Sequence, residues 1–354
     1  MDWSNRLTDL LNVTYPIVQA PMLGVSTPEM AAAVSNRGGL GSLAVGGLSP
    51  GVTLQLIRKT KSLTDKPFAV NLFAHDIPDY IDADLDPMRQ HILQLARKRG
   101  YNLDVAALSN FSFYNHRHQV SSLIEEKITL VSFTFGCLDA ASIQTLKQNG
   151  CTLIGTATCV AEAQYLAQQG IDAIAIQGIE AGGHRGTFMP NIPLPEIGLM
   201  ALLPQIREIV HLPCIASGGI NSAATIRAAF ELGADGVQIG TAFIGTDESI
   251  AIPAYKHRVN GIKDTDTQLT RAFSGRWARG IRNEWMQEIE QAGIPIPPYP
   301  LQNSLTAQLR KLAQQHNDDA YTNLWAGQSA AKTISRSSKV IFDHLVQQYE
   351  MRYG

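Results

Sequence analysis

The sequence lacks the cysteine pattern of a metal site or of a disulfide-stabilised protein. Its four cysteines show no CxxC spacing, which argues against a zinc site and against a disulfide framework. No apolar stretch approaches the ~20 residues that cross a membrane. The first residues also lack the charged-then-apolar pattern of a signal peptide. These absences predict a cytoplasmic protein with reduced thiols, no bound metal and no membrane partner.

An excess of charge of one sign is absent as well. The 29 basic and 31 acidic residues leave no basic field for nucleic acid. The P-loop, the GxSxG nucleophile motif and the HExxH zinc motif do not occur. Gly39-x-Gly41 resembles a piece of a dinucleotide fingerprint, but it precedes a strand-like run instead of following one. We therefore expect a globular enzyme that acts on a small molecule, and we make no prediction about its oligomeric state.

Short apolar runs recur along the chain and alternate with longer amphipathic segments. Such runs are typical of strands that are buried on both faces. The eight runs are Ile17 to Met22, Leu40 to Val45, Phe68 to Phe73, Leu130 to Phe135, Thr152 to Ala157, Ala173 to Gly178, Pro213 to Gly218 and Gly236 to Thr241.

The segments between these runs carry helix start and stop signals. Thr27 and Ser49 each precede a proline, as expected of an N-cap followed by proline in the first turn. Residues 161–170 end on a glycine, and residues 221–233 begin with Asn221 as a cap and end on a glycine. Eight strand–helix units over roughly 245 residues predict an α/β protein with a (β/α)8 TIM barrel. A doubly wound open sheet is the alternative fold.

The spacing of the strands also predicts the domain organisation. Residues 1–262 would form the barrel, with an insertion at about 74–129 after the third strand. Insertions at the carboxyl ends of barrel strands commonly build lids and substrate walls. Residues 263–354 carry no barrel unit of their own, so we expect them to form a helical appendage that packs on the barrel.

The loop after the sixth strand is the main candidate for chemistry. Four glycines lie within nine residues around His184. Glycine loses more freedom on folding than any other residue, so this cluster favours a loop with unusual backbone angles or close approach to a ligand. His184 would then face a substrate. The alternative is a flexible turn in which the histidine has no role.

Four of the predicted strands carry one primary amide within an apolar run, namely Gln19, Asn71, Gln177 and Gln238. A buried amide without a partner costs on the order of 1–3 kcal/mol, so each must meet one. The four side chains could bond to one another as a polar layer. They could instead converge on a flat heterocycle with alternating donors and acceptors, a description that fits flavin.

Two further loops have the composition of a phosphate cradle. Ser217, Gly218 and Gly219 follow the seventh strand and lead into a helix N-terminus, and Gly240 and Thr241 follow the eighth. Barrels commonly hold phosphate between these two loops through backbone N–H groups and the helix dipole. A tight turn is the alternative for the first loop. Phosphate at one side and amides across the mouth together favour FMN.

Other polar residues are weaker candidates. His116 and His118 lie in the predicted insertion, where metal binding is a minor alternative. His75 follows the third strand and fits a solvated loop better than a pocket wall. Three arginines near the start of the tail would suit an anion, although a surface position is the commoner explanation. They are Arg276, Arg279 and Arg282.

These motifs together resemble the nitronate monooxygenases, formerly called 2-nitropropane dioxygenases, and the resemblance covers most of the chain. Trp277 departs from the pattern, where a proline is more usual. The motifs that carry the resemblance are Gln19 to Met22, Phe68 to Phe73, Gly178 to Gly186, Ala216 to Ile220, Gly233 to Thr241, Gly275 to Asn283 and Leu324 to Gln328.

The resemblance implies an FMN-dependent barrel that oxidises alkyl nitronates, with propionate 3-nitronate as the expected substrate. It implies that O₂ is consumed, that a carbonyl product and nitrite or nitrate are released, and that the reaction passes through a flavin semiquinone. His184 would be the catalytic residue. The full candidate set for the cofactor is Gln19, Ala20, Met22, Asn71, Gln177, Gly182, Gly183, Ser217, Gly218, Gly219, Gln238, Ile239, Gly240 and Thr241.

Two other functions stay open at this point. FMN-dependent enoyl-acyl-carrier-protein reductases share a similar glycine–histidine loop and would consume NAD(P)H. A barrel without flavin, either a phosphosugar lyase or a ligand carrier, is the third hypothesis.

Overall fold

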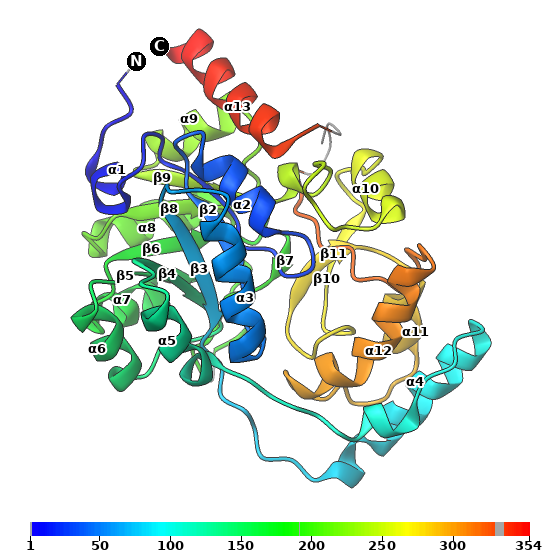
Figure 1. The fold of residues 1–354 in the computed structure, drawn as a ribbon. Helices are drawn as coiled ribbons and strands as arrows, with labels where there is room; N and C mark the ends of the chain where they lie inside the picture. The colour runs from blue at the N-terminus through cyan, green and yellow to red at the C-terminus, as the bar shows by residue number, and fades with distance from the viewer. Residues whose placement is uncertain (1, 191, 330–335) are drawn as a thin grey trace.

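Eight parallel strands form the centre of the computed structural model, which describes residues 2–190, 192–329 and 336–354 (Figure 1). The strand order is β1-β9-β8-β6-β5-β4-β3-β2, and a parallel bridge between Val18 and Leu40 joins its two ends. The barrel is therefore closed, as predicted, and the open sheet is excluded. Its strands are β1 Ile17–Gln19, β2 Gly41–Ala44, β3 Phe68–Phe73, β4 Leu130–Thr134, β5 Thr152–Ala157, β6 Ala173–Gln177, β8 Cys214–Ser217 and β9 Gly236–Ile239.

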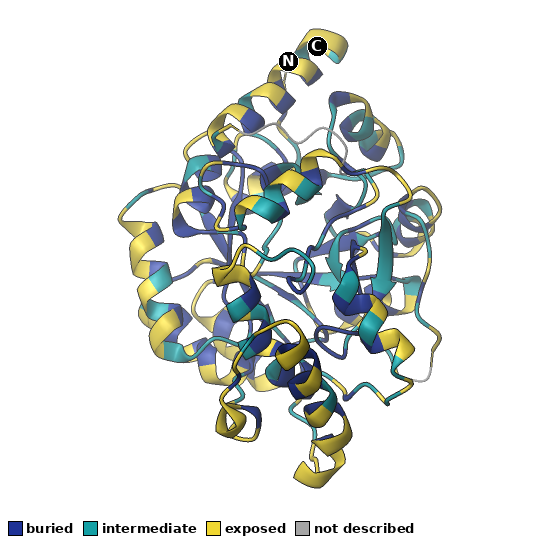
Figure 2. Cartoon of the chain, turned by 90° about the vertical axis from the view of Figure 1, so that its right-hand side faces the viewer, coloured by how far each residue is buried: buried dark blue, intermediate teal, exposed yellow. Residues whose placement is uncertain are grey.

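Helices surround this barrel and turn their exposed residues outward, whereas the strands are buried (Figure 2). The predicted caps at Thr27 and Ser49 each accept a backbone hydrogen bond at their helix. The cap of α9 is Ser222 and not Asn221, whose amide bonds the carbonyl of Ser329 instead. The barrel helices are α2 Pro28–Ser35, α3 Pro50–Lys61, α5 His116–Glu125, α6 Ala140–Gln148, α7 Val160–Gln168, α8 Leu199–Ile209 and α9 Ala223–Glu231.

The short helix α1 (Arg6–Leu11) closes the amino-terminal end of the barrel. Leu7 and Leu11 are buried in one apolar cluster with interior barrel residues such as Val18, Ala69 and Ile215. A larger cluster fills the layer between strands and helices. Because the amino-terminal end of the barrel is packed with apolar side chains, only the carboxyl-terminal end is available for a ligand.

The insertion after β3 is shorter than predicted. Helix α5 contacts α3, α6 and β3, so it is the barrel helix between the third and fourth strands. The inserted part consists of the 3₁₀ turns Asp82–Leu85 and Val105–Leu108 and the helix α4 (Asp86–Lys98). His116 and His118 therefore lie in the first turn of a barrel helix and not in the insertion, and His116 Nε2 lies 2.7 Å from Asp139 Oδ2.

The tail joins the inserted helix in a second apolar core. Met88 and Ile92 of α4 are buried with Phe273, Trp285 and Leu305 of the tail. We call this unit, formed by residues 76–115 and 263–329, the cap. The helix α10 (Pro253–Asn260) precedes the tail part of the cap. The remaining elements of the cap are β10 Thr267–Thr270, β11 Ala278–Ile281, α11 Glu284–Gln291 and α12 Leu301–Gln315.

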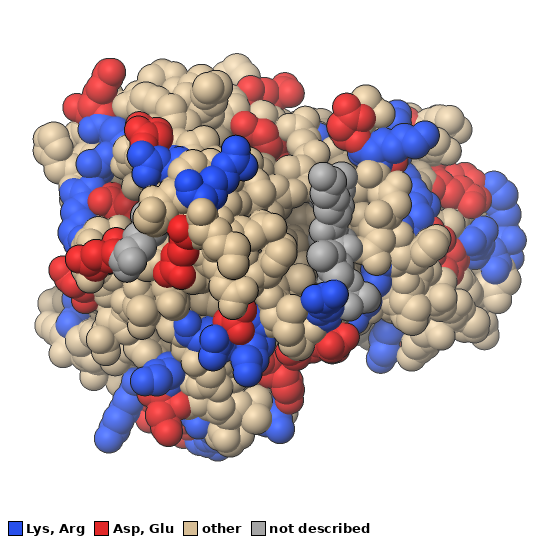
Figure 3. All heavy atoms as spheres, turned by 90° about the horizontal axis from the view of Figure 1, so that it is seen from above, with Lys and Arg blue, Asp and Glu red and all other residues tan. Residues whose placement is uncertain are grey.

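The last helix, α13 (Ser338–Tyr353), leaves the cap and returns to the barrel. It contacts α2 and α9, and Tyr349 packs on Trp3 with ring centroids 4.6 Å apart. The two ends of the described chain consequently lie close together (Figure 1). Among the described residues, no helix is long and apolar enough to cross a membrane. Acidic and basic side chains are interspersed on the face seen in Figure 3.

Candidate active site

A cavity of about 540 Å³ lies between the carboxyl-terminal end of the barrel and the cap. Two walls of different chemistry enclose it. The barrel wall consists of inward residues of the strands and of the loops that follow them. The cap wall consists of residues 112–114 of the insertion and of lining residues between 299 and 329 of the tail. Ligands of TIM barrels bind at this end, because the βα loops converge there.

Small polar side chains form a layer on the barrel wall. Asn71 Nδ2 donates to Ser132 Oγ at 2.9 Å, and Gln238 Nε2 donates to Ser217 Oγ at 3.2 Å. Gln177 accepts from the N–H of Gly186 and donates to the carbonyl of His184. The amides bond to hydroxyl and backbone groups and not to one another. The hypothesis of a self-contained amide layer is therefore wrong.

Gln19 and Ile239, two residues predicted to hold a cofactor, do not line the cavity. Side chains alternate between the two faces of a strand. Val18, Ala20 and Gln238 face the cavity, so Gln19 and Ile239 point outward toward the helices. Gln19 is fully buried there, where its Oε1 accepts from the N–H of Ser42 and its Nε2 donates to Ser26 Oγ. We leave both residues out of the cofactor set proposed below.

The loop after β8 lines the cavity with glycine backbone. Gly218 and Gly219 adopt φ values of +122° and +69°, which L-residues rarely adopt. Within the described residues, the N–H groups of Gly218, Gly219 and Ile220 have no protein acceptor. Successive unpaired N–H groups before the N-terminus of α9 form a concave site that favours an anion. This arrangement fits the predicted phosphate cradle.

The glycine–histidine loop is fixed by buried charged side chains. Gly183–His184 forms strand β7, which pairs with β11 of the tail. The fully buried Arg185 donates to the carbonyls of Gly178, Gln177 and Pro195. The fully buried Glu162 of α7 accepts from Thr187 and from the N–H of Phe188. These contacts hold the glycine–histidine loop in place, so the alternative of a flexible turn is wrong.

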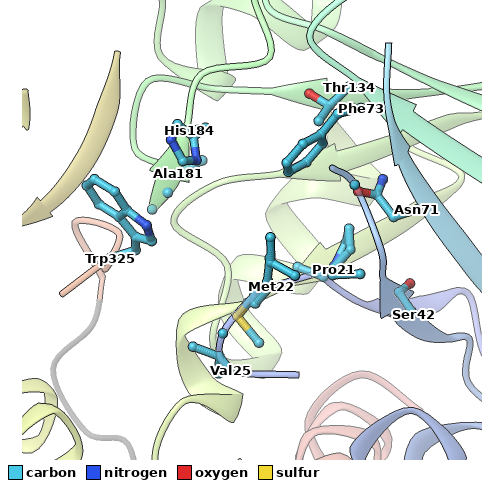
Figure 4. A pocket seen from close by; sticks show the side chains of 18 of the residues that line it. Pro21, Met22, Val25, Ser42, Asn71, Phe73, Thr134, Ala181, His184 and Trp325 are labelled. Atoms are coloured by element: carbon cyan, nitrogen blue, oxygen red, sulfur yellow. The ribbon is translucent and has the colours of Figure 1, made fainter. Parts of the chain in front are cut away.

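His184 projects from this loop into the cavity. Its ring lies beside Trp325 and Phe135, with centroids 5.2 and 5.4 Å away, and it faces the same space as Phe73 and Asn71 from the opposite side (Figure 4). Burial, reinforced by Arg276 and Arg310, lowers the pKa of His184 to about 3. The imidazole is consequently neutral at physiological pH and presents one hydrogen-bond donor and one acceptor.

Ser274 sets the orientation of this imidazole. Its Oγ lies 2.8 Å from His184 Nε2 and also contacts the N–H and the carbonyl of Arg276. If Oγ donates to Nε2, the proton of the neutral ring is on Nδ1. If Nε2 donates to Oγ, Nδ1 is a free acceptor. Ser274 directly precedes the motif Gly275 to Asn283, but its distance of 90 positions from His184 gave no sign of this contact.

Sequence reasoning missed most of the cap wall. Tyr299 lies 4.8 Å from His75 between ring centroids, and burial raises its pKa. His75 itself is 5% exposed and lines the cavity, which corrects the prediction of a solvated loop histidine. Burial and Arg276 lower the pKa of His75 to about 4. Arg310 and Trp325 complete this wall.

The three arginines near the start of the tail have different positions. Arg276 stacks over the ring of Phe135 at 4.2 Å and donates to the carbonyls of Phe135 and Thr187. Arg279 is buried and donates to the carbonyl of Ile179 at 2.9 Å. Both arginines therefore hold the glycine–histidine loop. The alternative that these arginines lie on the surface is confirmed only for Arg282, which is exposed.

The structure brings most of the predicted residues to one cavity. The lining residues from the predicted set are Ala20, Met22, Asn71, Gln177, Gly182, Gly183, His184, Ser217, Gly218, Gly219, Gln238, Gly240 and Thr241.

Known proteins resemble this chain over almost its whole length. Residues 4–348 match the family model described as nitronate monooxygenase. A probable nitronate monooxygenase of Staphylococcus saprophyticus is 40% identical over 98% of each chain. The solved nitroalkane oxidase of Streptomyces ansochromogenes is 35% identical over 98% of each chain, with a TM-score of 0.88. FabK of Thermotoga maritima is 27% identical over 99% of this chain and 97% of its own, with a TM-score of 0.77.

Proposed function

Because this chain belongs to the nitronate monooxygenase family of flavin-dependent oxidoreductases, we propose that it binds FMN and oxidises alkyl nitronates with O₂. Propionate 3-nitronate is the proposed substrate, and a carbonyl compound with nitrite or nitrate is the proposed product. The single observation that supports this best is the cavity in which a backbone anion cradle, an amide layer and a neutral His184 share one enclosed space.

The barrel wall fits FMN in its donors and acceptors. The N–H groups of Gly218, Gly219 and Ile220 would hold the phosphate, with Thr241 beside them. Asn71, Gln177 and Gln238 would meet the polar edge of the ring system, since each presents an amide at the mouth of the barrel. Ala20, Met22 and Gly182 supply small or apolar contacts around it.

A nitronate is already an anion, so its oxidation needs no prior removal of a proton. FMN held by the barrel wall would supply the one-electron chemistry that this oxidation needs. The protein's own contribution is position and electrostatics in an enclosed site. The aromatic rings of Phe135, Tyr299 and Trp325 surround His184 and keep bulk water from the reacting atoms.

His184 would act on the nitro group in one of two ways. With Nδ1 protonated, it donates a hydrogen bond to a nitro oxygen. With Nε2 donating to Ser274, the free Nδ1 accepts the α-proton of a neutral nitroalkane and acts as a general base. The low pKa of the ring keeps either tautomer neutral at working pH.

The proposal is tested by adding propionate 3-nitronate to the purified protein in air, without nicotinamide, and following oxygen uptake. We expect a yellow protein that consumes oxygen and releases nitrite or nitrate. A second reaction supplies NADH and an enoyl thioester instead. Consumption of NADH there, with no oxygen uptake in the first reaction, would replace the proposal by enoyl reduction. A colourless protein that does not take up FMN would refute both.

A further inference from the structure

Arg310 is a cation of the cavity wall that has no counter-ion among the described residues. It projects from α12 and lines the cavity on the cap side. Its Nε donates to Thr306 Oγ1 at 3.0 Å, and its Nη2 donates to the carbonyl and the side-chain oxygen of Asn303, both at 2.8 Å. In the described part of the chain, Nη1 has no hydrogen bond and the guanidinium forms no ion pair.

A guanidinium that lines a cavity without an opposite charge is unfavourable for the protein alone. Burial lowers the pKa of Arg310 to about 10, and the interaction with Tyr299 offsets only part of this effect. An ionised group taken out of water is costly unless an opposite charge and further hydrogen bonds compensate. The missing compensation is therefore expected from an anion that enters the cavity.

The other arginines near the cavity differ from Arg310 in their position and in their hydrogen-bond partners. Arg276 and Arg279 donate to carbonyls of the glycine–histidine loop and its neighbours. Arg185 is fully buried behind that loop and does not line the cavity. Arg310 differs because its side chain lies on the cavity surface with an N–H group still free.

The position of Arg310 separates it from the other anion site. Its three hydrogen bonds all go to residues of its own helix, so the guanidinium is held against the cap. The backbone N–H cradle of Gly218 and Gly219 belongs to the barrel wall. His184 interacts electrostatically with Arg310, and Tyr299 neighbours both residues. A ligand on Arg310 would therefore lie on the cap side of the cavity, which His184 also lines.

We propose that Arg310, positioned by Asn303 and Thr306, is a specificity-determining residue that binds a carboxylate at the far end of the substrate. Propionate 3-nitronate, the substrate proposed above, carries such a carboxylate. A guanidinium suits this role because its planar donors match the two oxygens of a carboxylate. The inference rests on the proposed function for the identity of the reacting end, but not for the binding of the carboxylate.

The first test compares two nitronates of equal chain length in the holoenzyme. Arg310→Gln removes the charge, and we expect kcat/KM for propionate 3-nitronate to fall by about 10- to 100-fold, the range for a hydrogen bond to a charged group. Propyl-1-nitronate lacks the carboxylate, so its kcat/KM should change by less than about threefold on the same reasoning. Lys311→Gln, the exposed neighbour on the same helix, is the matched control.

A second variant keeps the proposal testable if the Arg310→Gln substitution disturbs folding. Arg310→Lys retains a charge without the planar fork, so propionate 3-nitronate should react at a rate between those of the wild type and Arg310→Gln. Equal losses on both nitronates, in either variant, would show that Arg310 acts on the nitro group or on the fold. No loss with propionate 3-nitronate would also overturn the proposal.

Calorimetric titration with succinate separates this inference from the proposed function. Succinate carries carboxylates but cannot be oxidised at a nitro group, so its binding does not depend on turnover. We expect binding to the wild type that weakens at least tenfold in Arg310→Gln and is unchanged in Lys311→Gln. If nitronates are not oxidised but this pattern holds, the carboxylate site stands and the reaction is wrong. If succinate binds equally well to Arg310→Gln, the site is wrong whatever the enzyme oxidises.

Discussion

The two walls of the cavity differ in what they are made of. The barrel wall is rich in glycines and short polar side chains, as in Gly219 and Asn71, although it also carries the rings of Phe73 and Phe135. The cap wall uses large side chains, namely aromatic rings such as Tyr299 and Trp325 and the cation Arg310. A wall of backbone groups fixes a ligand that is always the same, whereas a wall of long side chains can be changed one residue at a time. The contrast supports the proposals that the barrel wall holds the cofactor and that the cap wall selects the substrate.

The largest test of this contrast concerns His184, the residue between the two walls. We expect His184→Asn to retain FMN and to lower kcat/KM for neutral nitroalkanes by about 10²–10⁴-fold, the range for a general base. Nitronates, which need no proton removal, should lose less. Steady-state oxygen uptake with both substrates measures this, and His211→Asn, which changes an exposed histidine, is the control. Equal losses on both substrates would remove the base role.

A core substitution tests whether the cap wall depends on its own apolar core. Leu305 is fully buried between α12 and its neighbours, so Leu305→Ala should lower the free energy of unfolding by about 2–5 kcal/mol. Because the cap wall would shift, KM for the nitronate should rise while FMN stays bound. Leu203→Ala makes the same change in the core around the barrel, away from the cavity. Denaturant unfolding measures the change in stability, and steady-state kinetics measure the change in KM. A larger change in KM in the Leu203 variant than in the Leu305 variant would contradict this prediction.

The pH dependence of stability tests the burial of His75 under the cap. The folded pKa of about 4 lies below the ordinary value of 6.5, so the unfolded chain binds more protons between these pH values. Stability contributed by the neutral ring is therefore complete above pH 6.5 and is lost as the pH falls, by about 2 kcal/mol at pH 5. In His75→Gln, the fall in melting temperature between pH 7 and 5 should be smaller than in the wild type. An unchanged slope would show that His75 is solvated.

The smallest expected effect concerns the barrel wall. Gly219 has a φ of +69°, and an added Cβ would meet Glu180 only at an ordinary contact distance of 3.4 Å. The cost of Gly219→Ala is therefore conformational, about 1–2 kcal/mol. A loop that relaxes without ligand must regain this angle on binding, so FMN affinity should fall roughly tenfold, with kcat restored at saturating FMN. Gly51→Ala, at an open position, is the control in fluorescence titrations of FMN.

Much of the barrel was predictable because its signals are local. Each buried run and each following cap is written in a few consecutive residues, so all eight strands and the loops that carry His184 and Gly219 were found. The family resemblance rests on the same stretches, and the match over residues 4–348 confirms it. The error at Gln19 shows the limit of this reasoning. An amide in an apolar run does not reveal which face of the strand it occupies, and that depends on the register with β9.

The chain by itself determined which segments become strands and which loops are too rich in glycine to be ordinary turns. Only the folded structure decided what stands opposite them. Ser274 meets His184 across 90 positions, and α4 packs with α12 although more than half of the chain separates them. Such contacts leave no periodic signal in either partner, because each helix needs only an apolar face and any complementary face would satisfy it. The cap wall of the cavity was decided by these long-range contacts, and the barrel wall by local ones.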